Sequence, residues 1–322
     1  MNTESACESA FRRNGPFWHL YTSGETMEII FAGVADFLFG ITLLGICAAA
    51  FPRCRILTFA LMNNHLHVIL AGSREDVLDF FQLYKKRLQR YISTGGRDCS
   101  LRRFEADVFC IPDVKALRNE IVYVNRNGYV VHPDATPYSY WWSAGVFYFN
   151  PLARILPVVP FTSLTLRQRR EMCHCREVSL PDRYSVLTVY PPVLAQGGVA
   201  GMLNPADFCA LSEGEAYFRD AHHYFARLSK DHEAHAEVAR RLGDKLFLTD
   251  DELYKAICSI SSKEYGLTQP GLLQGGQKLE LARKMHFDYN ASNNQIRRIL
   301  KLPQDLVDTM FPKMRYSSSD NG

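Results

Sequence analysis

Two strand-length apolar runs joined by three turn residues constrain the fold of this chain more than any other feature. The first run is CRILTFAL, residues 54–61, and the second is HLHVILAG, residues 65–72. The MNN connection between them is too short for a crossover, so the two runs are expected to pair antiparallel as a β-hairpin. The chain therefore has to build an antiparallel sheet around this hairpin.

The segments around the hairpin predict a further strand and several helices. We expect a strand in FWHLYTSG, residues 17–24, a buried helix over 34–51, a helix over 73–93, and another over 112–130 that closes near Asn127-Gly128. This order of elements favours an α+β fold. Its simplest form is a ferredoxin-like antiparallel sheet with helices on one face.

Composition and charge narrow the class of protein and its location. One segment, Phe37–Phe51, is uncharged over 15 residues, but a membrane span needs about 20, so we expect a buried helix and no membrane contact. The first 15 residues are polar and nine cysteines are scattered along the chain. This pattern is typical of reduced thiols in a cytoplasmic protein. The net charge of +3 means that any nucleic-acid surface has to be local.

The chain divides into four parts by its sequence pattern. Residues 1–150 hold the predicted sheet, 151–245 form a connecting region with helices and no assigned function, 246–316 form a helical module, and 317–322 form a disordered tail. The mainly helical C-terminal region ends in a helix, a helix capped by Ser292, a tight turn at Lys301–Pro303 and a short helix. This layout is typical of a helix-turn-helix.

The C-terminal module has charges that point to duplex DNA, although not uniformly. Between residues 278 and 315 there are eight Lys or Arg and four Asp or Glu, and we expect Arg297 and Arg298 to contact phosphates. The short last helix, however, carries Asp305 and Asp308, which repel phosphate. The alternative is a packing or dimer element, and the chain is expected to be a monomer or a homodimer.

A pair of histidines opens the second run of the hairpin. Side chains two residues apart in a strand project to one face, so His65 and His67 are expected to lie together. Two neutral imidazoles make half of a divalent-metal site. The alternative is that each histidine makes a separate hydrogen bond.

Two strings of residues extend this pattern into a resemblance. The string ALMNNHLHVIL resembles the signature of the HUH nucleases, and most of all their single-tyrosine branch: insertion-sequence-type transposases and REP-associated tyrosine transposases. Downstream, YVNRNGYVVHPDATPYSYWWSA resembles the YI..NP and P..Y.WSS strings of the REP-associated members. Gly128 replaces a usual proline, and Asn63 stands where proline is frequent.

The resemblance implies residues 1–150 as an HUH-type catalytic domain, with Tyr123 as the catalytic residue and Asn127 four residues later. It implies a transposase-like enzyme that cleaves and rejoins single-stranded DNA beside a hairpin through a 5′-phosphotyrosine. Tyr84, Tyr91 and Tyr129 are rival tyrosines without an amide four residues on.

Helix geometry gives the four-residue spacing of Tyr123 and Asn127 a physical reason. Residues four apart share a helix face, so Asn127 can add an oxygen ligand to His65 and His67 while Tyr123 faces the bound phosphate. Mixed nitrogen and oxygen ligation suits Mg²⁺ or Mn²⁺. The alternative for Tyr123 is a packed core tyrosine.

Basic residues near these motifs predict the DNA contacts. In YKKRLQRY, Lys85, Lys86 and Arg90 can meet phosphates of single-stranded DNA, and Arg126 adds local charge. The alternative is a solvated helix face. Two other functions stay open: a non-catalytic DNA-binding regulator on the same fold, and a metal-independent α+β protein that binds a partner protein.

Overall fold

The computed structural model describes residues 3–24, 29–130, 140–155, 158–160, 165, 167, 186–189, 201–230, 232–243, 248 and 250–312. The chain forms two compact units, Met1–Leu228 and Ser229–Gly322. Each unit is described by itself.

The first unit is built on a four-stranded antiparallel sheet. Its strands are β1 (Phe17–Thr22), β2 (Arg55–Leu61), β3 (Leu66–Ala71) and β4 (Ala106–Ile111). They lie in the order β2-β3-β1-β4, and each neighbouring pair is antiparallel. The helices α2 (Val34–Ala50) and α3 (Arg74–Thr94) connect β1 to β2 and β3 to β4. This is the β-α-β-β-α-β order of the ferredoxin-like fold, so the predicted fold class and the β2–β3 hairpin are confirmed.

Helix α2 contains the long uncharged segment and packs inside the unit. Twelve of its 17 residues are buried. Gly40 allows the close approach, because a Cβ at this position would lie 2.7 Å from a ring carbon of Phe31 and 2.9 Å from Cδ1 of Leu61. Among the described helices, none has both the length and the apolarity that crossing a membrane requires.

Helix α3 begins and ends as its sequence predicts. The Ser73 side chain accepts a hydrogen bond from the Asp76 backbone N at 3.0 Å, and Glu75 and Asp76 lie in the first turn, where acidic groups stabilise a helix. Its buried residues include Phe80, Phe81 and Leu88. The helix packs on α2 and on the sheet.

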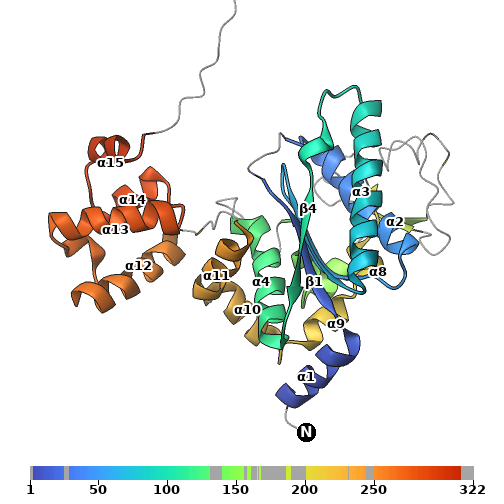
Figure 1. Ribbon diagram of the computed structural model, residues 1–322, viewed down its shortest axis with the longest axis horizontal. Coiled ribbons are helices and arrows are strands. Elements are labelled where there is room, and N and C mark those ends of the chain that lie inside the picture. Colours follow the sequence, from blue (N-terminus) through green and yellow to red (C-terminus); the bar gives the residue numbers. More distant parts are fainter. Residues whose placement is uncertain are drawn as a thin grey trace, which may run out of the picture. The chain divides into compact units, whose positions relative to one another are not determined.

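A third helix changes the predicted layering. Helix α4 (Val114–Val130) follows β4 and contacts β2 and β3. Figure 1 shows it on the opposite side of the sheet from α2 and α3. The prediction of helices on one face therefore holds only for the two crossover helices, because β3 is buried on both faces and needs cover on each. The helix also continues past Asn127-Gly128, to Val130.

The remaining elements of the first unit are short. They are α1 (Thr3–Asn14), η1 (Leu101–Arg103), η2 (Ala144–Phe147), α5 (Pro151–Arg154), α8 (Pro205–Phe208), α9 (Leu211–Ala216) and α10 (Ala221–Lys230), with a small antiparallel sheet of β5 (Val158–Pro160), β6 (Val186–Val189) and β7 (Gly201–Met202).

Two contacts join the later elements to β2. The Ala210 backbone N donates to Ile56 O at 2.7 Å, and Arg55 pairs with Glu213 at 2.9 Å. The unit that contains the sheet thus extends to Leu228, beyond the expected boundary at residue 150.

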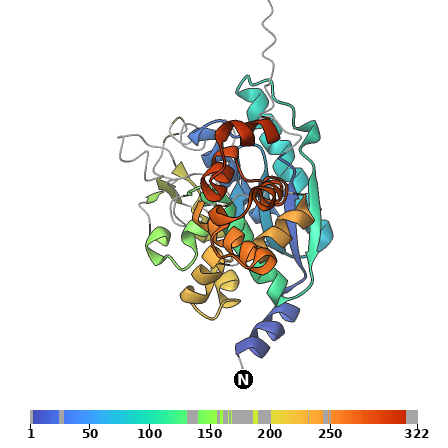
Figure 2. The ribbon, with the colours of Figure 1, turned by 90° about the vertical axis from the view of Figure 1, so that its left-hand side faces the viewer.

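The second unit is helical among its described residues. Its elements are α11 (His232–Leu242), α12 (Asp250–Tyr265), η4 (Pro270–Leu272), α13 (Gly275–Asp288), α14 (Asn293–Leu300) and α15 (Gln304–Met310). Figures 1 and 2 show α12 to α15 gathered together. Ser292 caps α14, and Lys301 ends it in the left-handed conformation with φ 52°. The predicted helices, cap and turn are present, whereas a helix-turn-helix that binds DNA stays a prediction. The predicted tail, 317–322, lies outside the described residues.

Candidate functional site

The two predicted metal histidines lie at the turn of the β2–β3 hairpin. The Met62 backbone N donates to His65 O at 2.8 Å and closes the turn. His65 precedes β3, which begins at Leu66, and His67 is the second residue of that strand. The two imidazole rings are 5.2 Å apart between centroids, with planes at 85°. The structure therefore brings the predicted pair together.

The loop after β1 orients the His65 ring. The Asn64 amide nitrogen donates to Gly24 O at 2.8 Å, which directs Oδ1 of Asn64 toward Nδ1 of His65, also at 2.8 Å. A Cβ at position 24 would lie 2.8 Å from that same Nδ1. Only glycine leaves room for the ring in this orientation.

Two buried residues that the sequence analysis missed reach the second histidine. Nδ1 of His67 lies 3.1 Å from Nε2 of His19, and Nδ1 of His19 lies 2.8 Å from Oε2 of Glu120. The exposed fractions are 1% for His67 and 0% for His19 and Glu120. A buried carboxylate requires such a partner, because leaving a charge without one in the protein interior is costly.

Tyr123 lies on the same side of the sheet as this chain of hydrogen bonds. Its ring centroid is 5.8 Å from that of His67, with planes at 84°, and 6.3 Å from that of His19. Helical spacing explains the placement, since Glu120, Tyr123 and Asn127 at i, i+3 and i+7 share one face of α4. The exposed fractions of Tyr123 and Asn127 are 1% and 5%.

The rival tyrosines lie elsewhere. Tyr84 and Tyr91 are on α3, across the sheet from α4. The Tyr84 hydroxyl donates to Gly40 O at 3.4 Å, and the Tyr91 hydroxyl donates to Asp36 at 2.9 Å. The side chain of Tyr129 lies outside the described residues. Of the two rivals that are described, neither shares the histidine face.

A second set of buried polar contacts holds α4 on the sheet. The Thr58 hydroxyl donates to Oδ1 of Asn125, and Nδ2 of Asn125 donates to the Tyr224 hydroxyl at 2.9 Å. Tyr148 stacks on Tyr224 at 5.4 Å and donates to Leu57 O at 2.9 Å. Burial raises the pKa of Tyr148 well above its usual value, so this hydroxyl stays protonated as a donor. Asn125 thereby fixes the helix between Tyr123 and Asn127.

The YWWS string runs beside the end of β2. The Tyr140 hydroxyl donates to Leu61 O at 2.6 Å, and the Leu61 backbone N donates to Trp142 O at 2.8 Å. Ser143 forms an isolated antiparallel bridge with Ala60. Burial raises the pKa of Tyr140, which keeps its proton available for this bond. This string supports the strand that leads into the histidine turn.

The residues present are compatible with one divalent cation on the two imidazoles. With metal–nitrogen bonds of about 2.1 Å, two ring centroids on one ion cannot be more than about 6.4 Å apart, and the observed separation is 5.2 Å. Within the described part of the chain, no three side chains of His, Cys, Asp or Glu are grouped as a metal site. Among the described residues, the Asn127 amide is a candidate third ligand of another type.

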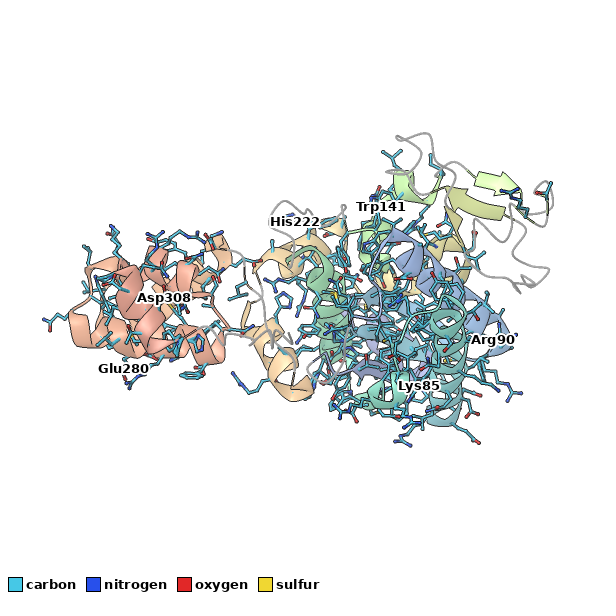
Figure 3. All side chains as sticks on the ribbon, turned by 90° about the horizontal axis from the view of Figure 1, so that it is seen from above. Lys85, Arg90, Trp141, His222, Glu280 and Asp308 are labelled. Atoms are coloured by element: carbon cyan, nitrogen blue, oxygen red, sulfur yellow. The ribbon has the colours of Figure 1, made fainter. Side chains whose placement is uncertain are left out.

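The predicted DNA contacts of the first unit do not gather at this site. Lys85, Lys86 and Arg90 lie on α3, as Figure 3 shows for Lys85 and Arg90, whereas Tyr123 lies across the sheet. Lys85 pairs with Glu105 at 2.5 Å, and the other two are exposed. Arg126 on α4 has an exposed fraction of 1%, so it does not contribute to an outer basic surface in this structure.

Arg297 and Arg298 are both exposed on α14 of the second unit. Arg298 pairs with Asp250 at 2.6 Å. Asp308, expected to repel phosphate, instead accepts hydrogen bonds from Asn293 at 2.7 Å and Gln304 at 3.0 Å. This acid therefore joins α14 to α15 within the module.

Comparisons with known proteins give little beyond this geometry. No protein-family model and no curated protein sequence matches the chain. A solved structure of a REP-associated tyrosine transposase bound to a REP hairpin is similar over 41% of this chain and 77% of that chain, with 15% sequence identity and a TM-score of 0.31. A TM-score this low does not establish a common fold.

Proposed function

We propose that the chain is a transposase-like enzyme that cleaves and rejoins single-stranded DNA through Tyr123. One observation carries the proposal: the Tyr123 ring packs 5.8 Å from the ring of His67, itself 5.2 Å from His65. A phenol and an imidazole pair thus face each other at one end of the sheet. His65, His67 and Asn127 are the proposed ligands of Mg²⁺ or Mn²⁺, whose oxygen- and nitrogen-based coordination these residue types suit.

The chemistry is a transesterification at phosphorus. The Tyr123 oxygen forms a bond to the 5′ phosphorus while the bond from phosphorus to the 3′ oxygen breaks. The phenol proton leaves to solvent, and the departing 3′ oxygen takes up a proton and becomes a hydroxyl. When bound, the cation offsets the charge that develops on the phosphate oxygens. A second 3′ hydroxyl reverses the step and joins the strands.

The proposed DNA contacts use basic residues on two helices. Lys85, Lys86 and Arg90 on α3 would contact phosphates beyond the cleaved bond, and Arg297 and Arg298 on α14 would contact duplex DNA. Such contacts fix position without reading sequence. Binding through them should weaken steeply as salt rises, because each neutralised phosphate releases counterions.

One observation favours a second candidate, a non-catalytic DNA-binding regulator on the same fold. The exposed fraction of Tyr123 is 1%, so the nucleophile lies beneath neighbouring side chains. In a regulator this phenol would serve packing alone.

A covalent-trapping experiment separates the two candidates. The protein is incubated with Mn²⁺ and 3′-labelled single-stranded DNA that carries a hairpin next to a single-stranded stretch, since the fragment on the 3′ side of the cleaved bond stays attached to the tyrosine. The enzyme should give an SDS-stable protein–DNA adduct that Tyr123→Phe abolishes. Tyr91→Phe is the matched control, since it removes a phenol from α3 across the sheet, and its adduct should persist.

Two results would overturn the proposal that Tyr123 cleaves DNA. The first is DNA binding with no adduct across hairpins of varied sequence, which supports the regulator. The second is an adduct that survives in Tyr123→Phe, which moves the nucleophile elsewhere. Loss of the adduct in His67→Ala with retained DNA binding would support the proposed metal role.

A further inference from the structure

Each histidine of the hairpin turn is held at Nδ1 by a different chain of hydrogen bonds. Glu120 and His19 reach His67, with separations of 2.8 Å and 3.1 Å. Gly24 and Asn64 reach His65, with two separations of 2.8 Å. An imidazole that donates from Nδ1 carries its lone pair on Nε2. The two chains of hydrogen bonds therefore determine whether the opposite ring nitrogen, Nε2, carries a proton or a lone pair.

The chain that ends on His67 has a direction. An ionised carboxylate only accepts hydrogen bonds, so Nδ1 of His19 donates to Glu120. In the neutral ring, Nε2 of His19 then accepts, and Nδ1 of His67 is the donor to it. Nε2 of His67 is left as the lone-pair nitrogen of its ring.

The chain that ends on His65 has the same outcome. The Asn64 amide nitrogen is identified by its bond to Gly24 O, so the atom facing His65 is the amide oxygen, which only accepts. Nδ1 of His65 must donate to it. Both imidazoles of the pair thus present Nε2 as an electron-pair donor.

We infer that Glu120 and His19 are positioning residues that hold His67 in its Nδ1–H tautomer, so that Nε2 is the ligand atom for the divalent cation. The part of the inference that concerns the cation rests on the proposed function, whereas the tautomer assignment does not. Outer partners that orient a ligand histidine and raise its basicity typically change metal affinity about 10- to 100-fold. A protonated His19 would reverse the chain, donate to Nδ1 of His67 and leave Nε2–H, which cannot bind a cation.

The first test is a tautomer measurement on the unsubstituted protein without metal. Histidine labelled with ¹⁵N distinguishes Nδ1–H from Nε2–H rings by their two-bond couplings to carbon-bound protons, and a His67→Gln spectrum identifies the His67 signals. We expect His67 as the Nδ1–H tautomer. An Nε2–H ring, or an imidazolium at His19, overturns the inference.

The second test combines the tautomer signal with Mn²⁺ binding in substituted proteins. Glu120→Gln introduces an amide that can donate to His19, which should shift His67 toward Nε2–H and weaken Mn²⁺ binding about 10- to 100-fold by calorimetry. The double variant His19→Phe with Glu120→Leu replaces the buried pair by apolar groups, which buried pairs frequently tolerate. It should lose the tautomer preference and bind Mn²⁺ more weakly.

A matched control is Glu213→Gln, which removes a carboxylate paired with Arg55 in the same unit. Its His67 signals and Mn²⁺ affinity should equal those of the unsubstituted protein. Folded Glu120→Gln protein with unchanged tautomer and affinity would contradict the inference, since a merely structural role leaves both unchanged.

The outcomes also separate this inference from the proposed function. An Nδ1–H ring that responds to Glu120→Gln, in a protein that does not bind Mn²⁺, would refute the metal site and leave the tautomer assignment standing. Tight Mn²⁺ binding by a protein whose His67 is Nε2–H would refute the tautomer assignment and leave the metal site standing.

Discussion

The two faces of the four-stranded sheet contrast sharply, although they belong to the same strands. Toward α2 and α3 the strands present side chains that are apolar and 0% exposed: Leu20, Phe59, Val68 and Leu70. Toward α4 apolar side chains such as Ile69 lie beside buried polar groups, which are His19, Thr58 and His67 on the strands and Glu120 and Asn125 on the helix.

The difference shows how one hairpin places apolar and polar side chains on opposite faces of a sheet. Alternation along β3 sends Val68 and Leu70 to one face and His67 to the other. Burying an apolar side chain stabilises a fold by about 1.5–3 kcal/mol, whereas a buried hydrogen bond contributes only about 0.5–1.5 kcal/mol net. Each side chain buried on the apolar face, toward α2 and α3, therefore contributes more folding free energy than each buried hydrogen bond on the polar face, toward α4.

The largest effect expected from this contrast is on the apolar face. Phe59→Ala removes a fully buried ring that stacks on Phe208 at 6.1 Å. It should lower the free energy of unfolding by about 3–5 kcal/mol, measured by urea denaturation. Ile29→Ala, at a side chain that is 58% exposed, should change it by less than about 0.5 kcal/mol. Equal losses for both variants would show that burial of Phe59 adds no stability beyond that of an exposed side chain.

A smaller effect is expected on the polar face. Asn125→Ala takes a partner from both Thr58 and Tyr224, so it should cost about 1–3 kcal/mol in the same assay. Tyr224→Phe removes one of these two hydrogen bonds and keeps the ring, so it should cost less. If Tyr224→Phe cost as much as Asn125→Ala, the hydrogen bond to Thr58 would contribute nothing.

The smallest effect is a pH-dependent contact at the outer side of α4. The hydrogen bond from Arg118 is the main cause of a Glu4 pKa below its usual 4.5. A carboxyl group whose pKa is lower in the folded than in the unfolded protein stabilises the fold at pH values above its unfolded pKa. This stabilisation is lost as the pH falls through its folded pKa. Because Glu4 is 56% exposed, the contribution should be at most about 1 kcal/mol.

The check on this contact is a comparison of Glu4→Gln with the unsubstituted protein. The two unfolding free energies should differ at neutral pH and converge as the pH falls below the usual carboxyl pKa of 4.5 and through the lower pKa of folded Glu4. Glu8→Gln, at an exposed position of the same helix, is the control and should show no difference at either pH. A Glu4→Gln difference that persists in acid would assign the effect to packing.

Local patterns were enough to predict the hairpin, the buried helix α2 and the capped helix α3. In each case turn residues, an uncharged run or a cap with acids after it determines the element over short range. The edge strand β4 was missed because it is only half-buried and contains Asp107, which weakens the alternation. The helix α1 was not predicted because Cys7 is the only buried residue among its described side chains, so no apolar stripe marks it.

The partners of the site were beyond such local reasoning. His19 meets His67 because β1 pairs with β3 in a register that places Tyr21 opposite His67, and no sequence pattern sets that register. Glu120 is 101 residues from His19. A signal was present for His19, a lone polar residue in the apolar stretch FWHLY, whereas Glu120 follows the polar residues Arg118 and Asn119 and does not stand out.

The outer edge of β2 has a consequence for the addition of strands from other molecules. An edge strand with open backbone groups is a template on which another chain can add a strand. Here Leu61 N is taken by Trp142 O, and Ile56 O by Ala210 N. Residues from far along the chain thus cover the backbone groups of this edge. A shortened protein ending at residue 150 would expose the Ile56 carbonyl and should aggregate more readily.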